Sequence, residues 1–161
     1  MNKLLNLVCL ATIVFVLGTT DQSWAGQKGK FRCRAVLVNV KTSLLEIPLD
    51  TTKILRQGEW DGGTFNETGE SFLNHSRYQI YETYDGVEEK MYGYKIFTMP
   101  DSSKIYSKFE PNVKGDKLAG TFTFIGGTGK YKGVKGKGTY SLTIVTATLL
   151  WDSLEGEYEL P

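Results

Sequence analysis

Hydrophobic and polar residues alternate with a period of two along much of the chain after residue 25, and no stretch there has a convincing helical period. Such alternation is typical of strands with one buried face. The first clear case is residues 31–38, where Phe31, Cys33, Ala35 and Leu37 alternate with arginines and valines. Gly, Asp, Asn and Pro separate the segments. Further strands are predicted over 54–60 (a weaker candidate, ended by Gly62 and Gly63), 104–110, 118–125, 139–151 and 154–160.

The clearest predicted element is a hairpin over residues 72–99, because Asp85-Gly86 is a strong signal for a two-residue turn. That turn would place Ile80 opposite Met91 and Arg77 opposite Tyr94. One face then collects the apolar residues Phe72, Tyr78, Ile80, Met91 and Phe97, and we expect it to point inward. The other face collects His75, Arg77, Gln79, Tyr81, Tyr92, Tyr94 and Ile96, and we interpret it as the outer surface, with a small-molecule pocket as the alternative.

Together these segments predict about eight short strands with no room for crossover helices, which excludes a parallel sheet. A closed barrel is favoured over a sandwich because closure removes exposed strand edges. We therefore predict an all-β fold, an antiparallel eight-stranded closed β-barrel.

The N-terminal residues do not read as part of this fold. Lys3 precedes an apolar run over 7–17 and a polar stretch that ends in Ser23-Trp24-Ala25, the layout of a secretory signal peptide cut before Gly26. The apolar run is shorter than the roughly 20 residues that span a bilayer, although an uncleaved anchor is the alternative. The sequence thus predicts a signal peptide over 1–25, a single barrel domain over 26–161, and a secreted or periplasmic protein without a membrane span after cleavage.

Composition excludes several classes of function. The net charge of +1 is far from the strongly basic balance of nucleic-acid-binding domains. Removal of the signal peptide would leave Cys33 as the one cysteine, so no internal disulfide is expected. We interpret Cys33 as a small buried hydrophobe rather than a reactive thiol. His75 is the single histidine, and no metal site, cofactor or catalytic residue is predicted. Glu82 and Glu89 would be cross-strand neighbours in the predicted hairpin, and we interpret them as solvated rather than as an acid–base pair.

The most specific segment is the glycine-rich run over residues 120–140. It fails as a phosphate-binding loop, because Phe124 and Tyr131 stand where a glycine and a Ser or Thr are needed. We instead predict a structural turn built by Gly126, Gly127, Thr128 and Gly129, in which glycines adopt positive φ. The lysines that follow, from Lys130 to Lys137, are interpreted as solvated rather than as an anion site.

This run, Phe124-Ile-Gly-Gly-Thr-Gly-Lys-Tyr-Lys-Gly-Val-Lys-Gly with Gly138-Thr-Tyr140 after it, resembles the late strand-turn-strand of the allene oxide cyclase-like barrels, a group that includes the dirigent proteins. The resemblance covers about residues 90–141, and its specific part is Gly126 to Gly129. It implies an eight-stranded barrel around a cavity for an apolar molecule, and it places the chain with uncharacterised bacterial-type members. The catalytic residues of the plant enzymes have no counterpart here, so the fold transfers and the chemistry does not.

We predict an exported barrel that binds an apolar or aromatic small molecule in its interior and is more readily explained as a binding protein than as an enzyme. A cyclase or isomerase that confines a hydrophobic substrate is the first alternative. A structural or protein-interaction module, including a homo-oligomer, is the second. The residues predicted to line the interior are Phe31, Cys33, Tyr78, Ile80, Met91, Phe97, Phe122 and Phe124.

Overall fold

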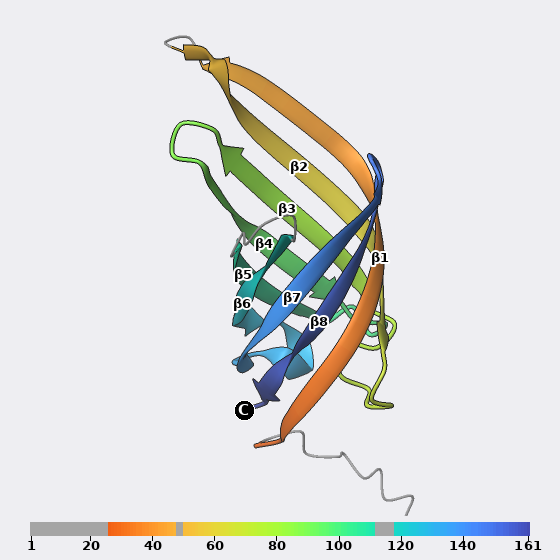
Figure 1. Cartoon of the computed structure of the whole chain (residues 1–161). Coiled ribbons are helices and arrows are strands. Elements are labelled where there is room, and N and C mark those ends of the chain that lie inside the picture. Colours follow the sequence, from red (N-terminus) through yellow and green to blue (C-terminus); the bar gives the residue numbers. More distant parts are fainter. Residues whose placement is uncertain (1–25, 48–49, 112–117) are drawn as a thin grey trace, which may run out of the picture.

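A computed structural model describes residues 26–47, 50–111 and 118–161, so the predicted signal peptide lies outside the described residues. The described part of the chain forms an antiparallel barrel of eight strands in chain order, closed where β8 pairs with β1 (Figure 1). The predicted fold class is confirmed. No helix within the described ranges has the length and apolar character needed to cross a membrane. The elements are β1 (Lys28–Ile47), β2 (Asp50–Asn66), β3 (Arg77–Asp85), β4 (Lys90–Thr98), β5 (Lys104–Pro111), β6 (Leu118–Gly127), the short 3-10 helix η1 (Gly129–Tyr131), β7 (Lys135–Thr146) and β8 (Leu149–Glu159).

The first two strands are much longer than the sequence predicts. β2 runs through Gly62 and Gly63 without a break, contrary to the prediction that these glycines end a strand. A Cβ on Gly62 would lie 1.8 Å from the carbonyl oxygen of Val36, so glycine is needed there for the close approach of β1 to β2. β8 accompanies β1 up to Val38. Beyond that residue β1 continues in pairing with β2, and β2 stays paired with β3 as far as Leu55, toward the top of Figure 1.

The predicted hairpin between β3 and β4 is present, but its register is different. Arg77 pairs with Thr98 instead of Tyr94, and Asp85 pairs with Lys90, so the loop spans residues 86–89 rather than two residues. The cause is the Asp85 side chain, whose Oδ1 accepts hydrogen bonds from the amides of Val87 (2.8 Å) and Glu88 (3.1 Å). Each β3 residue pairs with a β4 residue four positions later than predicted. Because the shift is an even number of residues, the side chains of both strands keep their predicted faces.

The long strand predicted over residues 139–151 is in fact a second hairpin. β7 ends at Thr146 and β8 begins at Leu149, with a tight turn between them. The sequence gives little sign of this turn because Ala147 and Thr148 are neither glycine nor proline. The correction matters because it gives the C-terminal strand an inner face that runs from Leu150 through Asp152 to Leu154, all of them buried.

One end of the barrel is closed by loops. The turn from the last residues of β6 into η1 includes Gly126 (φ 151°) and Gly129 (φ 57°), both in the region that favours glycine. Thr128 ties this turn to β5, since its amide donates to the Lys104 carbonyl (2.8 Å) and its Oγ1 accepts from the Lys104 amide (2.9 Å). The buried side chains of Tyr131, Val134 and Phe72 then fill this end. We refer to it as the closed end, and to the end with the β3–β4 turn as the open end.

Candidate functional site

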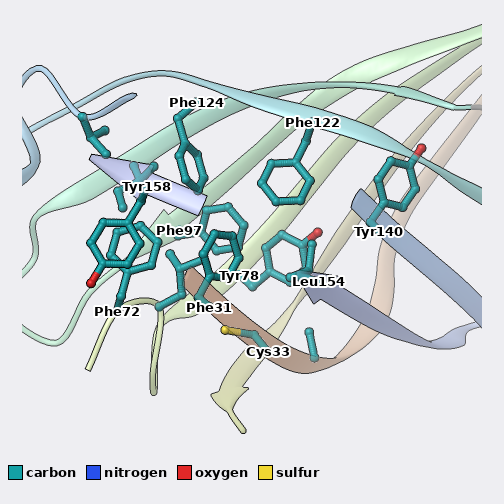
Figure 2. Packing of buried hydrophobic residues seen from close by; sticks show 14 of the residues in the cluster. Phe31, Cys33, Phe72, Tyr78, Phe97, Phe122, Phe124, Tyr140, Leu154 and Tyr158 are labelled. Atoms are coloured by element: carbon teal, nitrogen blue, oxygen red, sulfur yellow. The ribbon is translucent and has the colours of Figure 1, made fainter. Parts of the chain in front are cut away.

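The interior near the closed end is filled by aromatic side chains (Figure 2). The Phe72 and Tyr158 rings stack with centroids 3.8 Å apart, and the Tyr78 and Phe97 rings stack at 4.7 Å. Packing of this kind leaves side chains in contact with one another rather than with a ligand. The predicted interior residues found in this core, each at most 5% exposed, are Phe31, Cys33, Tyr78, Ile80, Phe97, Phe122 and Phe124.

The open end is different, because it contains a cavity of about 590 Å³. Its walls come from the ends of β2 to β6 and from the β3–β4 turn, on the upper left of Figure 1. Met91 is the member of the predicted interior set that lines this cavity, where it is half-buried. The cavity is mainly apolar, with three charged residues in its wall. The lining residues are Ile54, Arg56, Tyr84, Glu89, Lys90, Met91, Pro111 and Leu118.

Arg56 forms an ion pair with Glu82, in which Nη2 lies 3.5 Å from Oε1. The Arg56 side chain is 37% exposed and that of Glu82 only 10%, so the carboxylate is the more deeply buried partner. The predicted two-residue turn would place Glu82 opposite Glu89. In the structure Glu82 pairs with Gly93 of β4 instead. Glu82 lies on the same face of β3 as Tyr78 and Ile80, so it points to the interior, and its interpretation as a solvated acid was wrong.

Deeper in the barrel lies a fully buried polar cluster, Lys95, Asp152 and Tyr78. Lys95 Nζ donates to Asp152 Oδ2 at 2.7 Å and to the Tyr78 hydroxyl at 2.5 Å, while that hydroxyl donates to the same Oδ2 at 2.7 Å. The side chains of Lys95 and Asp152 are 1% and 0% exposed. A buried charge pair survives only when such hydrogen bonds offset the loss of hydration.

Aromatic rings enclose the Lys95 ammonium. Nζ lies 4.0 Å from the Tyr140 ring centroid and 5.4 Å from that of Phe109, within the range of cation–π attraction. Complete burial nevertheless lowers the pKa of Lys95, although the nearby Asp152 and Glu82 carboxylates act to raise it. Burial also raises the pKa of Tyr78 and of Tyr140, and the Asp152 carboxylate adds to both shifts.

Two polar atoms in this region have no hydrogen-bond partner in the part of the chain that the structure describes. They are Oδ1 of Asp152 and Nε1 of Trp60. Both belong to side chains on the inner surface, on β8 and β2. An unpaired buried acceptor and donor are costly, so these positions suit ordered water.

Sequence reasoning missed the polar residues of the interior, although a signal was present. Lys95 lies on the same face of β4 as Met91 and Phe97, which the alternation predicts to point inward. Asp152 likewise alternates in step with Leu150 and Leu154. A charged residue at a position of the alternation that is otherwise apolar indicates a buried charge.

The other residues considered from the sequence lie away from the open end. His75 is exposed in the loop before β3, where its ring packs edge-on to Phe65. Cys33 is fully buried, and burial, aided by the Glu67 charge, raises the pKa of its thiol to about 12. Lys130 is paired with Asp101 at 2.9 Å. Within the described ranges, no three His, Cys, Asp or Glu side chains gather as a metal site would require.

Comparison with known proteins supports the fold. No protein-family model and no curated protein matches the sequence. Among solved structures, the chain is similar to the pterocarpan synthase dirigent protein GePTS1, with a TM-score of 0.53 and 10% sequence identity. The match covers 84% of this chain and 88% of that one. At this identity the likeness concerns the fold alone.

Proposed function

We propose that this chain is an exported barrel protein, secreted or periplasmic, that binds an apolar or aromatic small molecule in the cavity at its open end. The observation that carries this proposal is the cavity itself, since about 590 Å³ of largely apolar space falls within the range of small-molecule pockets, about 300–1,000 Å³. Met91 borders it, and the other predicted interior residues support it from below by packing the closed end.

The structural likeness is consistent with this role. GePTS1 is described as a synthase and a dirigent protein, so a barrel of the same fold serves small-molecule chemistry in that case. The 10% identity carries no substrate across, and a bacterial-type origin for this chain stays a prediction.

The experiment that tests binding is a fluorescence titration of the purified protein with phenylnaphthylamine, a neutral aromatic dye. We expect saturable binding that Met91→Glu weakens at least tenfold, because the substitution places a charge in the apolar cavity. The matched control is Tyr92→Glu, one residue away on the exposed outer face, which should change the affinity less than twofold. Equal loss in both variants, or no saturable binding, would refute the proposal.

Export is proposed from the N-terminal sequence alone. Expression of the full chain in a secreting host, followed by N-terminal sequencing of the exported product, should give Gly26 as the first residue. Retention of residues 1–25 on a membrane-bound product would favour the uncleaved anchor instead.

A second candidate is a cyclase or isomerase that works by confinement. The observation that favours it is Glu82, a carboxylate with little exposure beside the cavity, where an acid or base would have to lie. Lys95, Asp152 and Tyr78 are too deeply buried to contact a substrate, so they would act as support. Turnover of a fatty-acid epoxide that Glu82→Gln abolishes, with dye binding retained, would establish this alternative.

A third candidate is a protein-interaction module. It is favoured by apolar side chains on the outer face of β1 and β8, such as Val36 and its cross-strand neighbour Trp151, which are 43% and 54% exposed. Light scattering of the purified chain would detect a homo-oligomer, and a monomer at high concentration would argue against self-association through this face.

A further inference from the structure

Three charged residues, Arg56, Glu89 and Lys90, line a cavity whose other walls are apolar. Arg56 is the more accessible member of its ion pair with Glu82. Its side chain is 37% exposed, against 10% for Glu82. A molecule that enters the cavity therefore meets the guanidinium before the carboxylate. At the position of Arg56 this order favours an anionic over a cationic group on the ligand, because the Glu82 carboxylate lies beneath the guanidinium.

The ion pair leaves most of the guanidinium unused. Within the described part of the chain, its one ion pair is the single Nη2 to Oε1 contact of 3.5 Å with Glu82. A guanidinium carries five N–H donors in a planar fork, which matches the two oxygens of a carboxylate or related anion. Among the residues that the structure describes, the remaining donors have no ion-pair partner and could bind an acceptor on the ligand.

The two strands next to β3 leave space for the Glu82 side chain beneath Arg56. Glu82 pairs with Gly58 on β2 and with Gly93 on β4. A Cβ on Gly58 would lie 2.8 Å from Glu82 Oε1, so the glycine makes room for the carboxylate. Glu82 can thus hold one side of the guanidinium in place, which reduces the cost of ordering Arg56 when a ligand binds.

We propose that the ligand of this cavity carries an acidic group, a carboxylate or sulfonate, that Arg56 binds, while its apolar body packs against Ile54, Met91 and Leu118. The inference rests on the proposed small-molecule function and names the class of ligand. Lys90 also borders the cavity, but its side chain is 69% exposed, so solvent screens its charge, and its ammonium lies 2.8 Å from Glu88. Arg56 is less exposed and offers a planar fork of donors, so we assign the selection of the anion to Arg56.

The test uses two dyes that differ in one group. Anilinonaphthalene sulfonate is phenylnaphthylamine with a sulfonate added, so the difference in their affinities reports the acidic group. For the unaltered protein we expect the sulfonate to bind at least tenfold more tightly than the neutral dye. Hydrogen bonds between charged groups contribute enough free energy for a factor of this size.

Substitutions of Arg56 should change the affinities of the two dyes by different amounts. Arg56→Gln should weaken sulfonate binding about tenfold or more and change neutral-dye affinity less than twofold. Arg56→Lys keeps the positive charge and loses the planar fork of N–H donors. Its affinity for the sulfonate dye should therefore lie between those of the unaltered protein and Arg56→Gln. Equal effects of Arg56→Gln on both dyes would overturn the proposal.

Two further variants serve as controls. Glu82→Gln keeps a side-chain oxygen that can accept from Arg56, and so keeps the guanidinium in place, but it removes the negative charge that competes with the ligand. We expect it to tighten sulfonate binding severalfold and to leave neutral-dye binding unchanged. Lys90→Gln removes a positive charge that borders the cavity and should weaken sulfonate binding less than twofold. A loss in Lys90→Gln as large as in Arg56→Gln would mean that general electrostatic attraction, and not Arg56, selects the anion.

The outcomes also distinguish this inference from the proposed function. Saturable neutral-dye binding that depends on Met91, with no preference for the sulfonate, would overturn the anion inference and leave small-molecule binding in place. Absence of binding by both dyes would overturn both.

Discussion

At the scale of single residues, the Lys95–Asp152 pair is the feature on which the interior depends most. Both side chains are almost fully buried, 2.7 Å apart, and Asp152 also accepts from Tyr78. Removal of one partner leaves an uncompensated charge in the core, which costs about 3–5 kcal/mol. Replacement of the whole cluster by apolar side chains avoids that cost.

We therefore expect Asp152→Leu alone to lower the free energy of unfolding by about 3–5 kcal/mol in urea denaturation. The triple variant Lys95→Met, Tyr78→Phe and Asp152→Leu should recover most of the loss. If the triple variant is as unstable as the single one, the loss arises from the shape of the substituted side chains and not from the unpaired charge.

Cys33 gives a second prediction at this scale. Its thiol is buried and its pKa is raised to about 12, so little thiolate is present at pH 8. In a Cys9→Ser background, which removes the other cysteine, Ellman's reagent should not label the folded protein and should label one thiol in denaturant. Rapid stoichiometric labelling of the folded protein would contradict the buried position.

At the scale of elements, the contact between β1 and β2 depends on a glycine. A side chain at Gly62 would collide with the Val36 carbonyl, whereas the nearest atom to a Cβ on Gly63 is 3.8 Å away. Gly62→Ala should cost about 3 kcal/mol or more, and Gly63→Ala should be neutral or slightly stabilising. Thermal or urea unfolding of the Gly62→Ala and Gly63→Ala variants measures this difference. Equal stability of the two variants would show that β1 and β2 do not approach as closely as described.

The turn after β4 supplies a pH-dependent prediction. Asp101 accepts from the Ser103 side chain and from Lys130, and these contacts lower its pKa from 3.8 to about 2. Because the folded-state pKa is depressed, the contribution to stability is present above about pH 4 and is lost as the pH falls through about 2. The difference in unfolding free energy between the unaltered protein and Asp101→Asn should therefore narrow from pH 5 to pH 2. A difference that stays constant over this range would mean that the carboxylate charge is not involved.

At the scale of the whole molecule, strands and their inner faces could be predicted because alternation is a local property of the sequence. The register of the β3–β4 hairpin could not, since the Asp85 side chain stabilises a four-residue loop that competes with the two-residue turn. Nor could the Lys95–Asp152 pair, whose members are 57 residues apart and meet only when the barrel closes. Alternation indicates which side chains point inward, but not how far along the barrel they fill the interior. The sequence therefore predicts a ligand site among aromatic residues that in the structure pack against one another.

The central claim is that the ligand site of this barrel lies at its open end, above a solid aromatic core. Methyl NMR of the protein titrated with phenylnaphthylamine tests it most directly. We predict shifts in the methyl signals of Ile54, Met91 and Leu118, which line the cavity, and none in those of Leu37, Ile105 and Leu154, which are buried in the core. Shifts confined to Val36 and Val38 on the outer face, or centred on the core residues, would contradict it.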